Sequence, residues 1–150
     1  MTDPTLGDEP VRASRRGGVL DALHVILGTF PVAYFLLAFL IDITYVRSGG
    51  YYIWPFFSIW LITAGLVAGW LAVLVGLIDW VVNRSARGRG TSWHAVLTVI
   101  ALVLGLFNAF IHSRDGWGSV VPEGIILSGV TTLLLIVAAL MGAVSSRRAA

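Results

Sequence analysis

The 150-residue chain has no cysteine, which excludes disulfides, iron–sulfur ligation, thiolate zinc sites and cysteine catalysis. Charged residues are also scarce. They make up 12% of the chain, against about 25% in an average soluble domain. So little charge cannot cover a water-facing surface, and a soluble enzyme is excluded. All basic residues are arginines that lie between apolar runs, so nucleic acid is not a predicted partner.

Long apolar runs take the place of that missing charge. A membrane-spanning helix needs about 20 mainly apolar residues, and four stretches qualify, at about residues 20–45, 56–82, 94–111 and 121–144. They predict an all-α fold, an integral membrane four-helix bundle with up-down-up-down topology. The four-helix domain covers residues 19–146. It follows a polar, flexible segment of residues 1–18 and precedes a basic tail of residues 147–150.

The arginines indicate how the bundle is oriented. Eight of the ten precede the first span, fill the second loop or end the chain, whereas the first and third loops hold only Arg47 and Arg114. By the positive-inside rule, both termini are cytoplasmic. The prediction is a multi-pass protein of the cell (plasma) membrane, specifically a bacterial inner membrane, with the lipid bilayer as its surroundings.

Small and polar residues recur every three or four positions in all four spans, so they share one face of each helix. In lipid that face points inward, because small residues allow close packing and polar residues need partners. The pair Gly65 and Gly69 is one such contact. Helix packing explains these stripes, and the alternative is that Gly28 and its neighbours leave room for a flat cofactor.

One polar layer is predicted near the cytoplasmic boundary, where His24 and His94 lie on different helices at similar depth. Two facing imidazoles in a bundle core are the usual axial ligands of a b-type haem iron, and Asp79 could accept a hydrogen bond from one ring. A structural alternative pairs His24 with Asp79 and makes His94 an interfacial residue at a helix start. A zinc or copper site formed by all three residues is a further alternative.

A second polar layer is predicted at the opposite boundary, from Asp42, Asn108, His112 and Arg114. Asn108 and His112 are four residues apart on one inward face, and we expect them to hydrogen-bond across to Asp42. This layer is interpreted as structural, and the functional alternative is that Arg114 contacts a quinone or a lipid headgroup. No charged residue lies between the two layers, which argues against a proton or ion path.

The segment from His24 to Pro31 resembles the opening of a family of small predicted membrane proteins, called domain of unknown function 2231. Members begin with His-Pro, a short apolar run and His-Phe-Pro. The resemblance continues over roughly residues 20–145, and its further motifs are Asp42, Gly76–Trp80, His94, Asn108 and Arg114. Some relatives are fused to or encoded beside Rieske-type domains, so the resemblance implies a redox setting. Two departures are Val25 for the proline and Thr29 for the second histidine.

Two functions remain open at this stage. The first is a small membrane protein that binds haem between His24 and His94 and takes part in membrane electron transfer, with a quinone or a protein as redox partner. Such a protein is an electron carrier rather than a hydrolase or transferase. The alternative is a non-catalytic membrane subunit or scaffold without a cofactor, in which both polar layers are structural.

Overall fold

The computed structural model describes residues 15–82, 92–114 and 117–149. Within these residues the elements are α1 (Arg15–Arg47), α2 (Ile53–Val82), α3 (Ser92–His112), the short 3-10 helix η2 (Trp117–Ser119) and α4 (Glu123–Ala149). All four α-helices are long and apolar enough to cross a membrane. The predicted all-α four-helix fold is confirmed. Helices suit this role because each satisfies its backbone hydrogen bonds internally.

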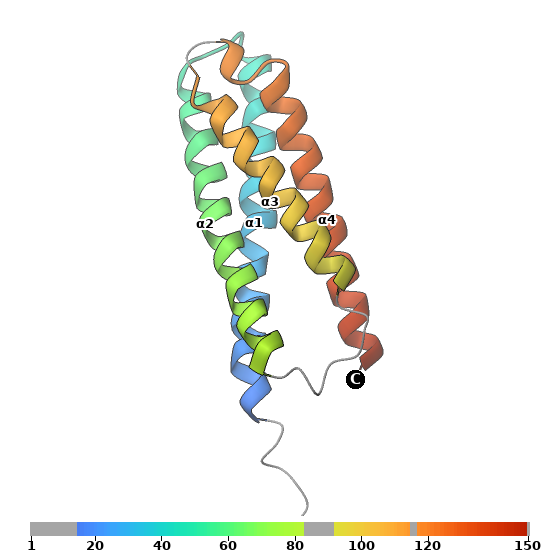
Figure 1. Cartoon of the computed structure of the whole chain (residues 1–150). Helices are drawn as coiled ribbons and strands as arrows, with labels where there is room; N and C mark the ends of the chain where they lie inside the picture. The colour runs from blue at the N-terminus through green and yellow to red at the C-terminus, as the bar shows by residue number, and fades with distance from the viewer. Residues whose placement is uncertain (1–14, 83–91, 115–116, 150) are drawn as a thin grey trace, which may run out of the picture.

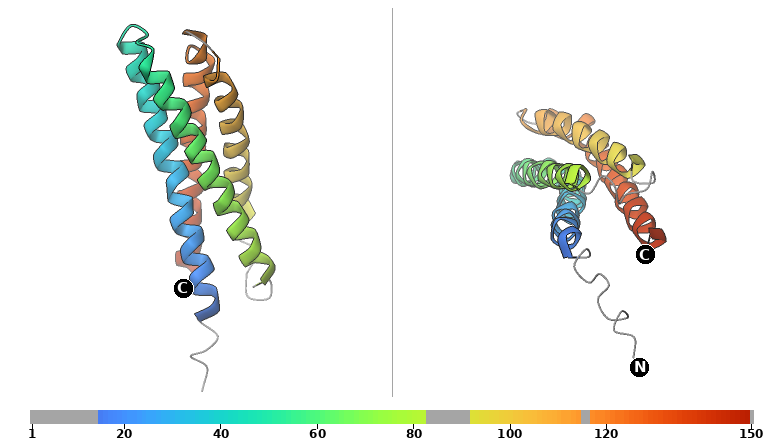
Figure 2. Two further views of the ribbon diagram at one scale, coloured as in Figure 1. Left: turned by 90° about the vertical axis from the view of Figure 1, so that its left-hand side faces the viewer. Right: turned by 60° about the horizontal axis from the view of Figure 1, so that its bottom comes forward.

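Successive helices run in opposite directions, and the bundle is built from two hairpins, α1 with α2 and α3 with α4 (Figure 1). We call the end that holds the α1–α2 connection and η2 the loop end. The other end, where α1 begins and α4 finishes, is the terminal end. Toward the terminal end the two hairpins diverge, as the views in Figures 1 and 2 both show.

The turn after α1 ends the helix by a glycine cap. The Gly50 amide donates to the Tyr45 carbonyl at 3.0 Å, and the Gly49 amide donates to the Val46 carbonyl at 3.3 Å. Gly49 has a φ of 72°, a left-handed conformation that glycine adopts without steric cost. The cap lets α2 begin after a short turn and return antiparallel to α1.

The inward face of each helix follows the predicted stripe of small and polar residues. Phe35 of α1 is fully buried, and it fits between Gly65 of α2 and Gly105 of α3. A Cβ on either glycine would lie 3.0 Å and 2.6 Å from the Phe35 ring, respectively. Large apolar side chains such as Trp60 and Phe110 are mostly exposed, as lipid-facing residues of a membrane bundle should be.

Two details differ from the sequence prediction. Steps of three and four residues place Asp21 on the inward stripe of α1 with His24, but in the structure Asp21 is exposed. It lies three residues before His24, and a step of three residues falls about 60° short of a full helical turn. That rotation carries its side chain off the buried face. The helix bounds also differ: α1 begins at Arg15, within the segment predicted to be flexible, and α4 begins at Glu123 rather than near residue 121.

Candidate functional site

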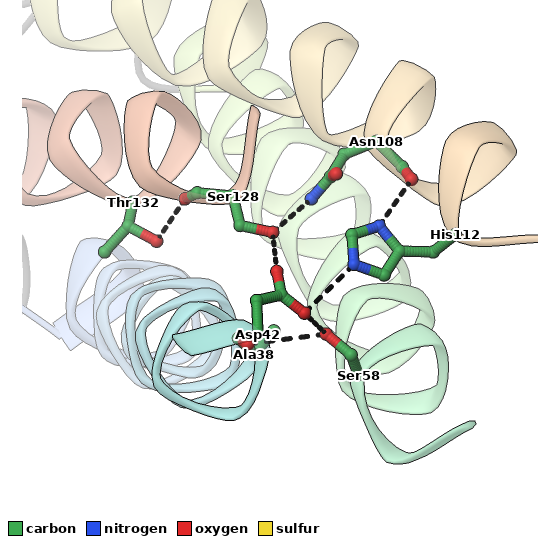
Figure 3. A network of polar contacts seen from close by, with 7 residues as sticks. All are labelled: Ala38, Asp42, Ser58, Asn108, His112, Ser128 and Thr132. Carbon is green, nitrogen blue, oxygen red and sulfur yellow. Dashed lines mark hydrogen bonds and ion pairs between the residues drawn. The ribbon is translucent and has the colours of Figure 1, made fainter. Parts of the chain in front are cut away.

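Asp42 of α1 is fully buried at the loop end, where it is the centre of a polar cluster (Figure 3). Its Oδ1 accepts a hydrogen bond from Ser58 Oγ of α2 at 2.6 Å and shares a hydrogen bond with His112 Nε2 of α3 at 3.0 Å. Its Oδ2 accepts one from Ser128 Oγ of α4 at 2.5 Å. One carboxyl group therefore joins all four helices. We call Asp42, Ser58, Asn108, His112 and Ser128 the loop-end cluster.

The partners of His112 indicate how many protons the cluster holds. Its Nδ1 donates to the backbone carbonyl of Asn108 at 3.0 Å, because a carbonyl can only accept. Its Nε2 faces the Asp42 carboxyl, so one further proton lies between the two side chains. The pair has no net charge whichever side chain holds that proton. This neutrality allows both side chains to be 0% exposed.

Ser128 connects Asn108 to the carboxyl group. Since the Ser128 hydroxyl donates to Asp42, its oxygen accepts the Asn108 Nδ2–H at 2.8 Å. This arrangement orients the Asn108 amide and leaves its Oδ1 buried, with no hydrogen-bond donor among the described residues. The Thr131 hydroxyl, three residues further along α4, is in the same state. Buried polar atoms of this kind are commonly satisfied by ordered water.

Arg114 lies outside this cluster. It follows the end of α3 and is exposed, while Asp42, Asn108 and His112 are buried together. The structure thus brings together three of the four residues predicted for this layer. It places Arg114 at the surface beside His112, where both residues line an open cavity.

At the terminal end, His24 of α1 and His94 of α3 face each other, with ring centroids 6.1 Å apart and ring planes at 85°. We call these two residues the histidine pair. His24 Nδ1 donates to the Ala72 carbonyl of α2 at 2.9 Å, and His94 Nδ1 donates to the Ala138 carbonyl of α4 at 2.6 Å. A carbonyl only accepts, so both Nδ1 atoms carry hydrogen. In a neutral ring the lone pair is then on Nε2.

Both rings lie against a glycine that follows the accepting carbonyl by one helical turn. A Cβ on Gly76, four residues after Ala72, would lie 2.9 Å from the His24 ring. A Cβ on Gly142, four residues after Ala138, would lie 3.1 Å from His94 Nδ1. The two hairpins therefore hold their histidines in the same way, by a carbonyl and a position without a side chain.

The two hairpins also carry polar groups at the same two levels. Asp42 follows His24 by 18 residues on α1, and His112 follows His94 by 18 residues on α3. Eighteen residues make five full helical turns. The two residues on each helix therefore point to the same side of it and lie about 27 Å apart along its axis. The bundle thus pairs His24 with His94 at one end and Asp42 with His112 at the other.

Asp79 of α2 is 2% exposed, three residues beyond Gly76. The acceptor role that the sequence suggested for Asp79 is filled, at Nδ1 of both rings, by backbone carbonyls. In the part of the chain that the structure describes, no three His, Asp or Glu side chains are grouped to hold a metal ion. These residues therefore give no support to the alternative of a three-residue zinc or copper site.

Comparison with known proteins gives the chain a family. The model of a family described as predicted membrane protein (DUF2231) matches residues 20–149, nearly all of the chain. The chain belongs to this family. No curated protein and no solved structure matches it. The match and the four apolar helices agree that this DUF2231 member is a multi-pass membrane protein.

Two serines of this DUF2231 member play a part that its sequence did not reveal. Their spacing places Ser58 and Ser128 on the inward stripes but names no partner for them, and in the structure both donate to Asp42. Each lies five residues after its helix begins, and Asp42 lies five residues before α1 ends. Equal distance from the loop end was the signal that could have brought the three together.

Proposed function

We propose that this protein binds one b-type haem between His24 and His94 and carries electrons within the membrane. The observation that supports the proposal is the state of the histidine pair. Two imidazoles on different helices are each held through Nδ1, and in a neutral ring this leaves the Nε2 lone pair for a metal ion. Coordinating histidines usually donate their other N–H to a carbonyl or carboxylate in this way, which fixes the ring and raises its basicity.

The ring separation agrees with a shared iron atom. A metal–nitrogen bond of about 2 Å places the centre of an imidazole about 3 Å from the metal, so rings on opposite sides are about 6 Å apart. The two centroids are 6.1 Å apart. Crossed ring planes are compatible with this arrangement, because each ring can rotate about its own metal–nitrogen bond.

One position near the histidine pair is open. Gly28 lies four residues after His24 on the same side of α1, and a Cβ there would meet nothing within 4 Å. Haem supplies a one-electron couple whose potential depends on its axial ligands and on the polarity around it. The contribution of the chain is to hold the rings and, with the apolar core around Phe35, to exclude water.

The arginine distribution supports a cytoplasmic position for the histidine pair in a bacterial inner membrane. Arg84, Arg87 and Arg89 lie between α2 and α3 in the sequence, outside the described residues, and further arginines lie at the start of α1 and in the last turn of α4. On the positive-inside rule the terminal end then faces the cytoplasm. A redox partner of this site would approach from that side.

The test uses the full chain, expressed with added haem precursor, purified in mild detergent and titrated with haemin. We expect a Soret band of six-coordinate low-spin haem. His24→Ala and His94→Ala should each abolish that spectrum, because either change removes one axial ligand. His112→Ala is the matched control and should leave the spectrum unchanged, since the residue lies about 27 Å of helical rise away. A helical, haem-supplied protein without a Soret band would overturn the proposal.

The second candidate is a non-catalytic membrane subunit or scaffold, and the loop-end cluster favours it. One buried carboxyl group joins four helices, an arrangement that stabilises a bundle and needs no ligand. On this candidate the protein is colourless, and His24→Ala costs stability without changing any spectrum. The absorbance experiment therefore separates the two candidates.

A further inference from the structure

A cavity of about 560 Å³ opens at the loop end between α1, α2 and α3. Its volume lies within the range of roughly 300–1,000 Å³ that small-molecule sites occupy. It is lined by aromatic and proline side chains, by glycines and serines, by Ile59, by the exposed Arg114 and by His112, whose side chain is itself buried. A cavity with one apolar and one polar side suits an amphipathic molecule, which has an apolar part and a polar part of its own.

The apolar side of the cavity lies where α2 begins. Tyr52, Pro55 and Phe56 line it, and the neighbouring Tyr51 and Trp54 extend this aromatic group. Aromatic residues at the ends of membrane helices mark the boundary between lipid and water. A ligand can therefore enter from the bilayer, with a flat apolar body against the Phe56 and Tyr52 rings.

The polar side offers one strong donor. Arg114 makes no ion pair or side-chain hydrogen bond with the other described residues. Several other donors around the cavity already have an acceptor: the Gly49 and Gly50 amides donate to α1 carbonyls, and the Ser113 hydroxyl donates to the Phe110 carbonyl. The exposed Tyr52 adds an uncharged hydroxyl beside Arg114. Phosphate groups are usually bound by several converging N–H donors. One guanidinium group suits a neutral molecule with a carbonyl oxygen better.

We propose that this cavity binds the ring of a lipid-soluble quinone. A ring carbonyl oxygen accepts a hydrogen bond from Arg114, the ring packs against Phe56 and Tyr52, and the apolar tail extends into the bilayer. His112 forms the inner wall of the cavity and is held by the loop-end cluster. The site lies five helical turns from the histidine pair, so it does not depend on haem binding.

The test uses the purified full chain in nanodiscs made of phosphatidylcholine, with a photoactivatable azidobenzoquinone carrying a ten-carbon tail. Labelling should saturate and map to the segments around Phe56 and Arg114. The unlabelled decyl-benzoquinone should compete with the probe, and phosphatidylglycerol should not. Arg114→Gln should weaken half-saturation about tenfold, as expected for one hydrogen bond to a charged group.

A matched pair of variants tests the cavity itself. Ile59→Phe adds volume to its lining and should abolish saturable labelling. Ile78→Phe makes the same change on the exposed face of the same helix and should have no effect. Labelling spread evenly over the lipid-facing helices, or equal in all variants, would overturn the proposal, as would competition by phosphatidylglycerol. His24→Ala should leave labelling intact. The labelling result therefore tests the quinone proposal even if the absorbance experiment overturns the haem proposal.

Discussion

Asp42→Ala tests whether the loop-end cluster contains a charged pair or only neutral hydrogen bonds. The substitution removes the acceptor of three buried donors, Ser58, His112 and Ser128. In membrane proteins a neutral side-chain hydrogen bond averages about 0.6 kcal/mol, so three neutral bonds are worth about 2 kcal/mol. Removing one partner of a buried charged pair costs about 3–5 kcal/mol. Both side chains of the pair are 0% exposed, and we expect the larger loss.

The assay is reversible unfolding in mixed micelles. Sodium dodecyl sulfate is titrated against helical circular dichroism, which gives the free energy of unfolding. Ser58→Ala is the control, because Asp42 keeps two of its three donors. It should cost about 0.6 kcal/mol, the average for one neutral side-chain hydrogen bond in a membrane protein.

The double variant Asp42→Ala/His112→Ala completes the cycle. Removing both partners leaves neither member of the pair buried alone, although the Ser58 and Ser128 hydroxyls still lose their acceptor. The double variant should therefore cost less than the sum of the two single variants. We expect a coupling energy of about 2 kcal/mol or more between the two sites. A loss of about 2 kcal/mol or less for Asp42→Ala, with additive single variants, would refute the charged-pair argument.

Two further predictions concern packing and orientation. Gly69→Leu should lower the free energy of unfolding by about 1–3 kcal/mol, because even a Cβ at this position would overlap the Leu102 side chain. Val67→Leu, on the exposed face, should change the free energy of unfolding little. Equal losses for the two variants in the same unfolding assay would contradict the assignment of Gly69 to the inward stripe. Reporter fusions after Ser48 and after Asp115 should show periplasmic exposure, and cytoplasmic activity from either would overturn the orientation inferred from the arginines.

The sequence alone determined the four helices and the faces they turn inward. Runs of about 20 apolar residues have one stable solution in lipid, a helix that satisfies its own backbone. Spacings of three and four then place Phe35, Gly65, Gly105 and Ser128 on inward faces before any contact is known. The sequence also indicated that Asp42, Asn108 and His112 share one level, because depth follows from helical rise.

Tertiary structure decided which atoms meet. The Nδ1 atoms of His24 and His94 bond to backbone carbonyls, and a carbonyl acceptor has no signature in the sequence because every residue has one. The rotation of each helix about its axis selected Ala72 and Ala138, and it turned Asp21 outward although its spacing resembles that of the buried residues. The cavity beside Arg114 likewise exists only once three helix ends converge, since its walls come from segments that are far apart in the chain.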